Sequence, residues 1–229
     1  MLKDLDTSFI SAKNADNSKN YVAVALYINS NGEGQHSGLL INFNKELKLF
    51  HFTSREVLIE DFQDVYEGTW YYYKTLDLIH PDEVETFLHH CEQIAKKSTP
   101  KWALVFDGSY FKEGVYFTNS GLKEYTTCVG FCINVVKGFL DGEEYIYVDD
   151  WNASSTDSWR AVYTDRFSKM LDKIKAENPN ITNIEEKFLK RITPIEYSVS
   201  AFLINLPIRK TDIDPNVAQM QGYVTLQRP

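Results

Sequence analysis

The amino-acid sequence predicts an α+β fold in which an antiparallel sheet packs against helices. Residues 21–28 (YVAVALYI) form a continuous β-prone run, which is typical of a buried strand. Residues 37–43 and 47–53 are two further strand-like runs, and the short break between them predicts a β-hairpin. Residues 81–97 and 126–139 carry apolar side chains three and four positions apart, which is the spacing of an amphipathic helix.

The turn of this hairpin decides how two histidines are placed. A two-residue turn at residues 44–45 puts His36 opposite Thr53 and makes His51 the diagonal neighbour of His36 on the same face of the sheet. A three-residue turn reverses that parity unless a bulge corrects it. The spacing therefore allows a His36–His51 pair without requiring one.

The other segments complete one predicted domain of residues 1–229, because no repeat, low-complexity stretch or linker divides the chain. Pro81 suits the start of the first helix, and Pro100 ends it. We expect an irregular lead-in at residues 1–20, strands at 70–73, 102–106, 145–148 and 197–206, helices at 161–175 and 183–191, and a loosely packed tail at 207–229.

The composition argues against several classes of protein. Hydrophobic residues make up 43% of the chain and charged residues 24%, as in an ordinary globular protein, and the net charge of −8 disfavours nucleic-acid binding. The most basic run, residues 187–191, alternates with apolar residues and is typical of the solvated face of a helix. No segment has the ~20 consecutive apolar residues of a membrane helix, so no membrane span is expected. Residues 1–20 lack the apolar run of a secretory signal, which predicts a cytoplasmic protein or one exported without an N-terminal signal peptide.

Cys128 is the candidate chemical centre. It lies in the predicted first turn of a helix that Thr126 or Thr127 can cap. Unpaired N–H groups and the helix dipole favour a thiolate at this place, and the backbone N–H of Cys128 can point at a developing oxyanion. The alternative is a small buried apolar side chain, which by position alone is the commoner case.

A cysteine nucleophile needs a base, and the base needs a residue that orients it. His36 and His51 can fill these two roles if they pair. His80 precedes a proline and a helix, where a role in the turn is sufficient to explain it. Asp149 and Asp150 are consecutive at a strand end, which favours loop or capping roles over a catalytic carboxylate pair.

No metal site or cofactor is expected. His89 and His90 flank Cys91, but adjacent helical positions point about 100° apart and cannot converge on one ion. Cys128 and Cys132 share a helix face without the paired spacing of a zinc site.

The order of these motifs resembles the circularly permuted NlpC/P60 papain-like group, which includes the lecithin:retinol acyltransferase-like proteins. The sequence His36-Ser37-Gly38-Leu39 opens a strand, His51 lies on the next one, and Cys128-Val129-Gly130-Phe131 opens a helix. In ordinary NlpC/P60 enzymes the cysteine motif comes first, whereas in the permuted branch the histidine strand precedes the cysteine helix. The resemblance implies a permuted papain-like core with insertions, with Cys128 as nucleophile, His36 as general base and His51 as the residue that orients His36.

The sequence departs from that group in three places. Residues 53–127 form a long insertion between the hairpin and the cysteine helix, Ser-Gly follows His36 instead of an apolar residue, and residues 140–229 have no counterpart that we can name. These departures bear on the substrate more than on the three site residues.

Together these observations predict a cysteine-dependent hydrolase or acyltransferase that acts on an amide or ester bond through an acyl-thioester. Substrates implied by the resemblance are peptidoglycan peptides, proteins or lipid acyl groups. The aromatic residues 70–73 and Trp151 can line a cleft or pack in a core. One alternative is a non-catalytic protein-binding or toxin-neutralising module with a protein partner. Another is a redox-sensing Cys128 with Cys132 as its resolving thiol, although helical geometry strains such a disulfide.

Overall fold

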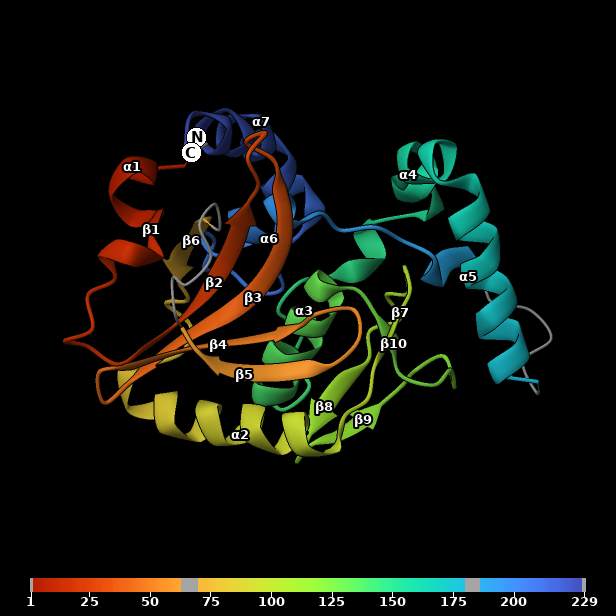
Figure 1. Cartoon of the computed structure of the whole chain (residues 1–229), viewed down its shortest axis with the longest axis horizontal. Coiled ribbons are helices and arrows are strands. Elements are labelled where there is room, and N and C mark those ends of the chain that lie inside the picture. Colours follow the sequence, from red (N-terminus) through yellow and green to blue (C-terminus); the bar gives the residue numbers. More distant parts are fainter. Residues whose placement is uncertain (1, 63–69, 180–185, 228–229) are drawn as a thin grey trace.

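The computed structural model describes residues 2–62, 70–179 and 186–227 and has the predicted α+β architecture (Figure 1). Its main sheet has the strand order β1-β6-β2-β3-β4-β5, and every neighbouring pair is antiparallel. The strands are β1 (Ile10–Ser11), β2 (Tyr21–Ile28), β3 (Gly34–Phe43), β4 (Glu46–Phe52), β5 (Val57–Asp61) and β6 (Trp70–Thr75).

The β3–β4 hairpin has the two-residue turn on which the histidine prediction depended. Phe43 pairs with Glu46, and the ladder continues to the pair Leu39–Phe50. Asn44 and Lys45 both have positive φ, 52° and 71°, as a tight hairpin turn requires. The even-numbered residues at the start of β3 therefore share one face of the sheet with His51.

The two faces of the sheet are buried in different ways. One face, which we call the helix face, carries Leu39 and Phe50, and the Phe50 ring contacts Phe131 of α3 (Cys128–Phe139) at a centroid distance of 5.2 Å. The other face, which we call the histidine face, carries Leu40 and Leu49 and packs against the N-terminal segment. This alternation follows from the period of two along a strand.

Local sequence signals set both predicted helices. A 3-10 turn (Pro81–Glu83) capped by His80 leads into α2 (Val84–Lys97), whose apolar stripe lies in the core under the sheet. The Thr127 hydroxyl accepts a hydrogen bond from the Gly130 amide at 3.0 Å and so caps α3.

The segments around α3 are less regular than expected. The predicted strand at 102–106 is reduced to β7 (Lys101–Trp102), which pairs in parallel with β10 (Tyr125–Thr126), and Val105 forms a single bridge with Leu189. The predicted strand at 145–148 is wrong, because it is reduced to one bridge at Ile146 before a 3-10 turn (Val148–Asp150). A small hairpin of β8 (Tyr110–Lys112) and β9 (Val115–Phe117) packs against α3.

Two further helices form a second, smaller cluster with the segment after β7. They are α4 (Asp157–Val162), which follows a 3-10 turn (Ala153–Thr156), and α5 (Thr164–Glu177). Phe167, Met170 and Ile174 of α5 pack against Ala103 and Leu104. The predicted helix at 183–191 lies partly outside the described residues and otherwise consists of a 3-10 turn (Glu186–Phe188). Within that basic run Lys190 is only 2% exposed, so the expectation of a solvated face fails there.

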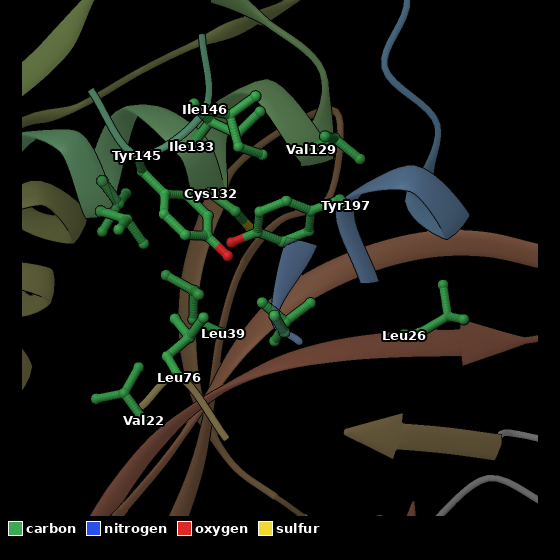
Figure 2. Packing of buried hydrophobic residues seen from close by; sticks show 14 of the residues in the cluster. Val22, Leu26, Leu39, Leu76, Val129, Cys132, Ile133, Tyr145, Ile146 and Tyr197 are labelled. Carbon is green, nitrogen blue, oxygen red and sulfur yellow. The ribbon is translucent and has the colours of Figure 1, made fainter. Parts of the chain in front are cut away.

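The predicted strand at 197–206 is wrong. Residues Pro194–Ser200 form helix α6, which begins with a capping box between Thr193 and Glu196 and with Pro194 in its first turn. A short apolar run is ambiguous between a buried strand and a buried helix, and here the capping residues decide it. Figure 2 shows Tyr197 of α6 beside Tyr145 and Cys132 in the core.

The two ends of the chain pack on each other. The lead-in forms α1 (Leu5–Ser8), β1 and a 3-10 turn (Ala12–Asn14) around the fully buried Phe9. The expectation of a loose C-terminal tail is wrong, because α7 (Lys210–Leu226) buries Met220 and Val224. The Tyr223 hydroxyl of α7 donates a hydrogen bond to the Phe9 carbonyl at 3.0 Å. In the described part of the chain, no helix is both long and apolar enough to cross a membrane.

Candidate active site

His36 and His51 form the predicted pair on the histidine face of the sheet. Nε2 of His36 lies 2.9 Å from Nδ1 of His51, and the two rings meet edge to face at an interplanar angle of 71°. Because Leu39 pairs with Phe50, Gly38 lies across from His51. A Cβ atom at residue 38 would lie 3.1 Å from the His51 Cβ and 2.9 Å from a methyl carbon of Leu49. The absence of a side chain at Gly38 therefore leaves the space that the His51 side chain occupies.

Glu60 extends this pair and was not identified from the sequence. Its Oε2 atom lies 2.9 Å from Nε2 of His51. It reaches the histidine because β5 pairs with β4, with Leu58 opposite His51 and Glu60 two residues further on the same face. The signal available in the sequence was the β-prone run at residues 57–59 after the turn residues Ser54 and Arg55.

The His36–His51 and His51–Glu60 hydrogen bonds determine which imidazole nitrogens carry a hydrogen. A carboxylate only accepts, so Nε2 of His51 donates to Glu60. The Nδ1 atom of a neutral His51 is then the acceptor, which requires Nε2 of His36 to carry a hydrogen. Nδ1 of His36 is left with a free lone pair, so the arrangement Glu60–His51–His36 presents one basic nitrogen.

Burial keeps His36 neutral. Burial, and to a smaller extent the neighbouring His51, lower the pKa of the His36 imidazole to about 4. At neutral pH the ring is therefore an unprotonated base.

Cys128 occupies the first position of α3, as the sequence predicts, but its thiol is in the protonated form. Burial raises the pKa of Cys128 and outweighs hydrogen bonds from the backbone of Ser37, Val129 and Cys128 itself, together with the positive charge of Arg191, all of which lower it. The expectation that the helix start alone would favour a thiolate is thus wrong.

The thiol reaches the sheet next to His36, although the two side chains come from opposite faces. The β3–β4 ladder ends at the Leu39–Phe50 pair, and the backbone of Ser37, beyond that end, hydrogen-bonds to the Cys128 sulfur. Ser37 directly follows His36 in the chain. Among the described residues, a hydrogen bond joins His36 to His51, whereas none joins Cys128 to either imidazole.

Tyr71 is a further ionisable residue near the histidine pair. On the histidine face it is paired with Tyr27, which is itself paired with His36, and the two tyrosine rings are 5.6 Å apart. Burial raises the pKa of Tyr71, and electrostatic coupling to the ionisable groups of Glu60, Tyr27 and Cys128 raises it further. The Tyr71 phenol therefore stays protonated, and Cys128 contributes to that shift less than burial and Glu60 do.

The other candidate residues from the sequence make contacts that stabilise the fold. His90 contacts the Val135 carbonyl at 3.2 Å, and Cys91 is fully buried. Trp151, which we weighed as a cleft residue, is 1% exposed and donates to Glu196. Asp149 and Asp150 form ion pairs in their loop, with Lys190 and Arg209 respectively. Over the described ranges no three His, Cys, Asp or Glu side chains are grouped as a metal site requires.

Comparison with known proteins gives no match that bears on this site. No family model matches the chain, and no curated protein or solved structure matches it at a significant level.

Proposed function

We propose that this protein is a cysteine-dependent hydrolase or acyltransferase in which Cys128 is the nucleophile and His36 the general base. The observation that carries the proposal is the hydrogen-bonded series Glu60–His51–His36, which leaves one nitrogen of His36 with a free lone pair. The next residue of the same strand, Ser37, interacts through its backbone with the half-buried thiol of Cys128 at a helix N-terminus. This is the set of roles that nucleophilic catalysis requires. The resemblance to the permuted NlpC/P60 group and its papain-like core is part of the same proposal.

The protonation states favour a general-base mechanism over a preformed thiolate–imidazolium pair. Nδ1 of His36 removes the thiol proton as the sulfur attacks a carbonyl carbon, and His51, itself held by Glu60, orients His36 by accepting the hydrogen bond from its Nε2. The backbone N–H of Cys128 stabilises the developing oxyanion. His36 then gives the proton to the departing amine or alcohol, which leaves an acyl-thioester. A water molecule or an acceptor group, deprotonated by His36, takes the acyl group and releases the thiol.

The substrates we propose are amides or esters of peptidoglycan peptides, proteins or lipid acyl groups. No hydrogen bond joins Cys128 to His36 in the described residues, so the mechanism requires substrate binding to bring the thiol and the imidazole together. Catalytic hydrogen bonds are often long before the substrate binds.

Acylation by an activated ester tests the proposal. Protein incubated with p-nitrophenyl acetate is analysed by intact mass and peptide mapping, and we expect an acetyl group on Cys128 that depends on His36. Cys91 and Cys132 are buried and free, so they provide an internal background. His36→Gln should lose the adduct, while His89→Gln, which changes an exposed histidine on α2, should keep it.

A non-catalytic binding module is the outcome that would replace this proposal. It is indicated if wild-type protein gains no adduct, or if the adduct forms equally in the His36→Gln variant.

A further inference from the structure

A groove lined by positive side chains lies beside the candidate active site. It has a volume of about 500 Å³, within the range of small-molecule sites, and its walls come from the β4–β5 turn, from β7 and from α5. Five of its lining residues are cationic and none is acidic; they are Arg55, Lys101, Arg166, Lys169 and Lys173. The sequence predicted no local basic patch, and the net charge of the chain is −8, so this concentration arises only on folding.

Several of these charges are not neutralised by the protein. Lys101 is paired with Glu177 at 2.6 Å, and the same carboxylate lies near Lys173. Within the described part of the chain, Arg55, Arg166 and Lys169 have no carboxylate within ion-pair distance. Like charges gathered in one hollow repel one another, and a bound anion would remove that cost.

Arg166 is held in a fixed orientation on an aromatic wall. Its guanidinium carbon lies 4.8 Å from the centre of the Trp102 ring and 6.0 Å from that of Trp159, and the two indoles are themselves 5.5 Å apart. A guanidinium stacked in this way keeps its N–H edge free for two parallel hydrogen bonds to a carboxylate or phosphate.

The groove shares structural elements with both halves of the candidate site. Trp102 pairs with Thr126, and Cys128 follows two residues later, a chain distance of about 7 Å at the rise of a strand. Arg55 lies in the turn that joins β4 with His51 to β5 with Glu60. Along the chain, the groove is thus within a few residues of both the thiol and His51.

We infer that this groove is an anion-binding subsite for the substrate. It binds a carboxylate or phosphate group of the same molecule whose carbonyl carbon is attacked by Cys128. The inference rests on the proposed function for its link to catalysis, whereas anion binding itself can be measured without any turnover.

Calorimetric titration of the full-length protein tests the subsite with two probes, inorganic pyrophosphate and a Glu-Glu dipeptide. We expect saturable binding that weakens at high salt. Stronger binding of pyrophosphate supports a phosphate-bearing substrate, and stronger binding of the dipeptide supports a carboxylate-bearing one. The inference is overturned if neither probe binds saturably.

A matched pair of variants separates the groove from general electrostatics. Lys169→Glu and Lys175→Glu change the same helix by the same charge, but only Lys169 lines the groove. We expect at least a tenfold loss of affinity for Lys169→Glu and less than a twofold change for Lys175→Glu. Equal losses in the two variants overturn the inference. Arg166→Gln is the second groove variant, used with the same expectation if Lys169→Glu does not fold.

Three further measurements keep the two proposals distinguishable. Cys128→Ala should retain anion binding, and Lys169→Glu should still be acetylated by the neutral ester. In wild-type protein an activated ester with a carboxylate on its acyl chain should acylate Cys128 faster than the neutral ester, and Lys169→Glu should abolish this preference. A preference that survives in Lys169→Glu contradicts the link between groove and thiol.

Discussion

Gly38 faces His51 across the β3–β4 hairpin, with room for a hydrogen but not for a methyl group. A Cβ atom there would meet the His51 Cβ at 3.1 Å and the Phe50 carbonyl oxygen at 3.2 Å. The position of the imidazole, and with it the contacts to His36 and Glu60, thus depends on a residue that takes no part in the chemistry.

Gly38→Ala should therefore damage both stability and acylation. Overpacking of this kind costs about 1–3 kcal/mol of the free energy of unfolding, and a displaced His51 no longer orients His36. Urea unfolding and the acetylation rate of Cys128 measure the two effects. Gly222→Ala is the control, since a Cβ at that exposed helical position meets nothing within 4 Å, and it should stabilise α7 by about 0.5–1 kcal/mol. A Gly38→Ala variant with wild-type acylation contradicts the role given to His51.

Glu60→Gln should slow acylation while leaving the fold intact. The amide can present its N–H₂ to His51, which favours the wrong tautomer of both imidazoles. We expect a loss of at least about tenfold in the rate, against the total of about 10²–10⁴ that a positioned base contributes. Since Glu60 is more than half exposed, its ion pair adds little to stability. Glu56→Gln, at an exposed position in the preceding turn, serves as the control, and equal rates in the two variants would remove Glu60 from the relay.

Protein stability should fall as the pH drops from 7 to 5, in part because of His36. The folded-state pKa of this imidazole is depressed to about 4, so between pH 4 and its ordinary value near 6.5 the unfolded chain binds more protons than the folded one. The stability that depends on neutral His36 is present above pH 6.5 and is lost as the pH falls toward 4. For a partly exposed group we expect a difference of about 1–2 kcal/mol between pH 7 and pH 5.

Urea unfolding of wild type and His36→Gln at the two pH values isolates that contribution. The half-buried His90 also has a pKa lowered by burial and acts in the same direction, but it is common to both proteins and cancels in the comparison. Identical pH dependence in the two proteins would show that His36 is not held neutral by the fold.

Iodoacetamide should label one of the three cysteines in folded protein, and only slowly at neutral pH. Cys91 and Cys132 are fully buried, whereas Cys128 is half-buried with a pKa raised by burial. The labelling rate should rise toward a midpoint above the ordinary thiol range. Arg191→Gln removes a charge that lowers this pKa and should move the midpoint higher, while Arg160→Gln, on α4, should not. A midpoint below the ordinary range would indicate a preformed thiolate–imidazolium pair.

Elements whose signals lie within a few residues of chain could be predicted from the sequence. The Thr127 cap and the apolar spacing after it predict α3 with Cys128 in its first turn. The spacing at residues 44–45 only allowed the parity that brings His36 to His51, and the observed two-residue turn settled it. The same kind of local evidence was ambiguous for residues 197–206, where an apolar run suits a strand and a buried helix equally well.

The contacts that each of these elements makes depend on tertiary packing and could not be predicted from the sequence. Glu60 joins the histidines because β5 pairs with β4, and Arg55, Lys101 and Arg166 share a groove because a turn, a strand and a helix converge there. Tertiary packing also decided the ionisation of Cys128, where burial by the surrounding chain outweighs the helix N-terminus. Caps and periodicity act over one or two turns of chain, whereas burial and the convergence of distant charges depend on how every element packs, and no single segment encodes them.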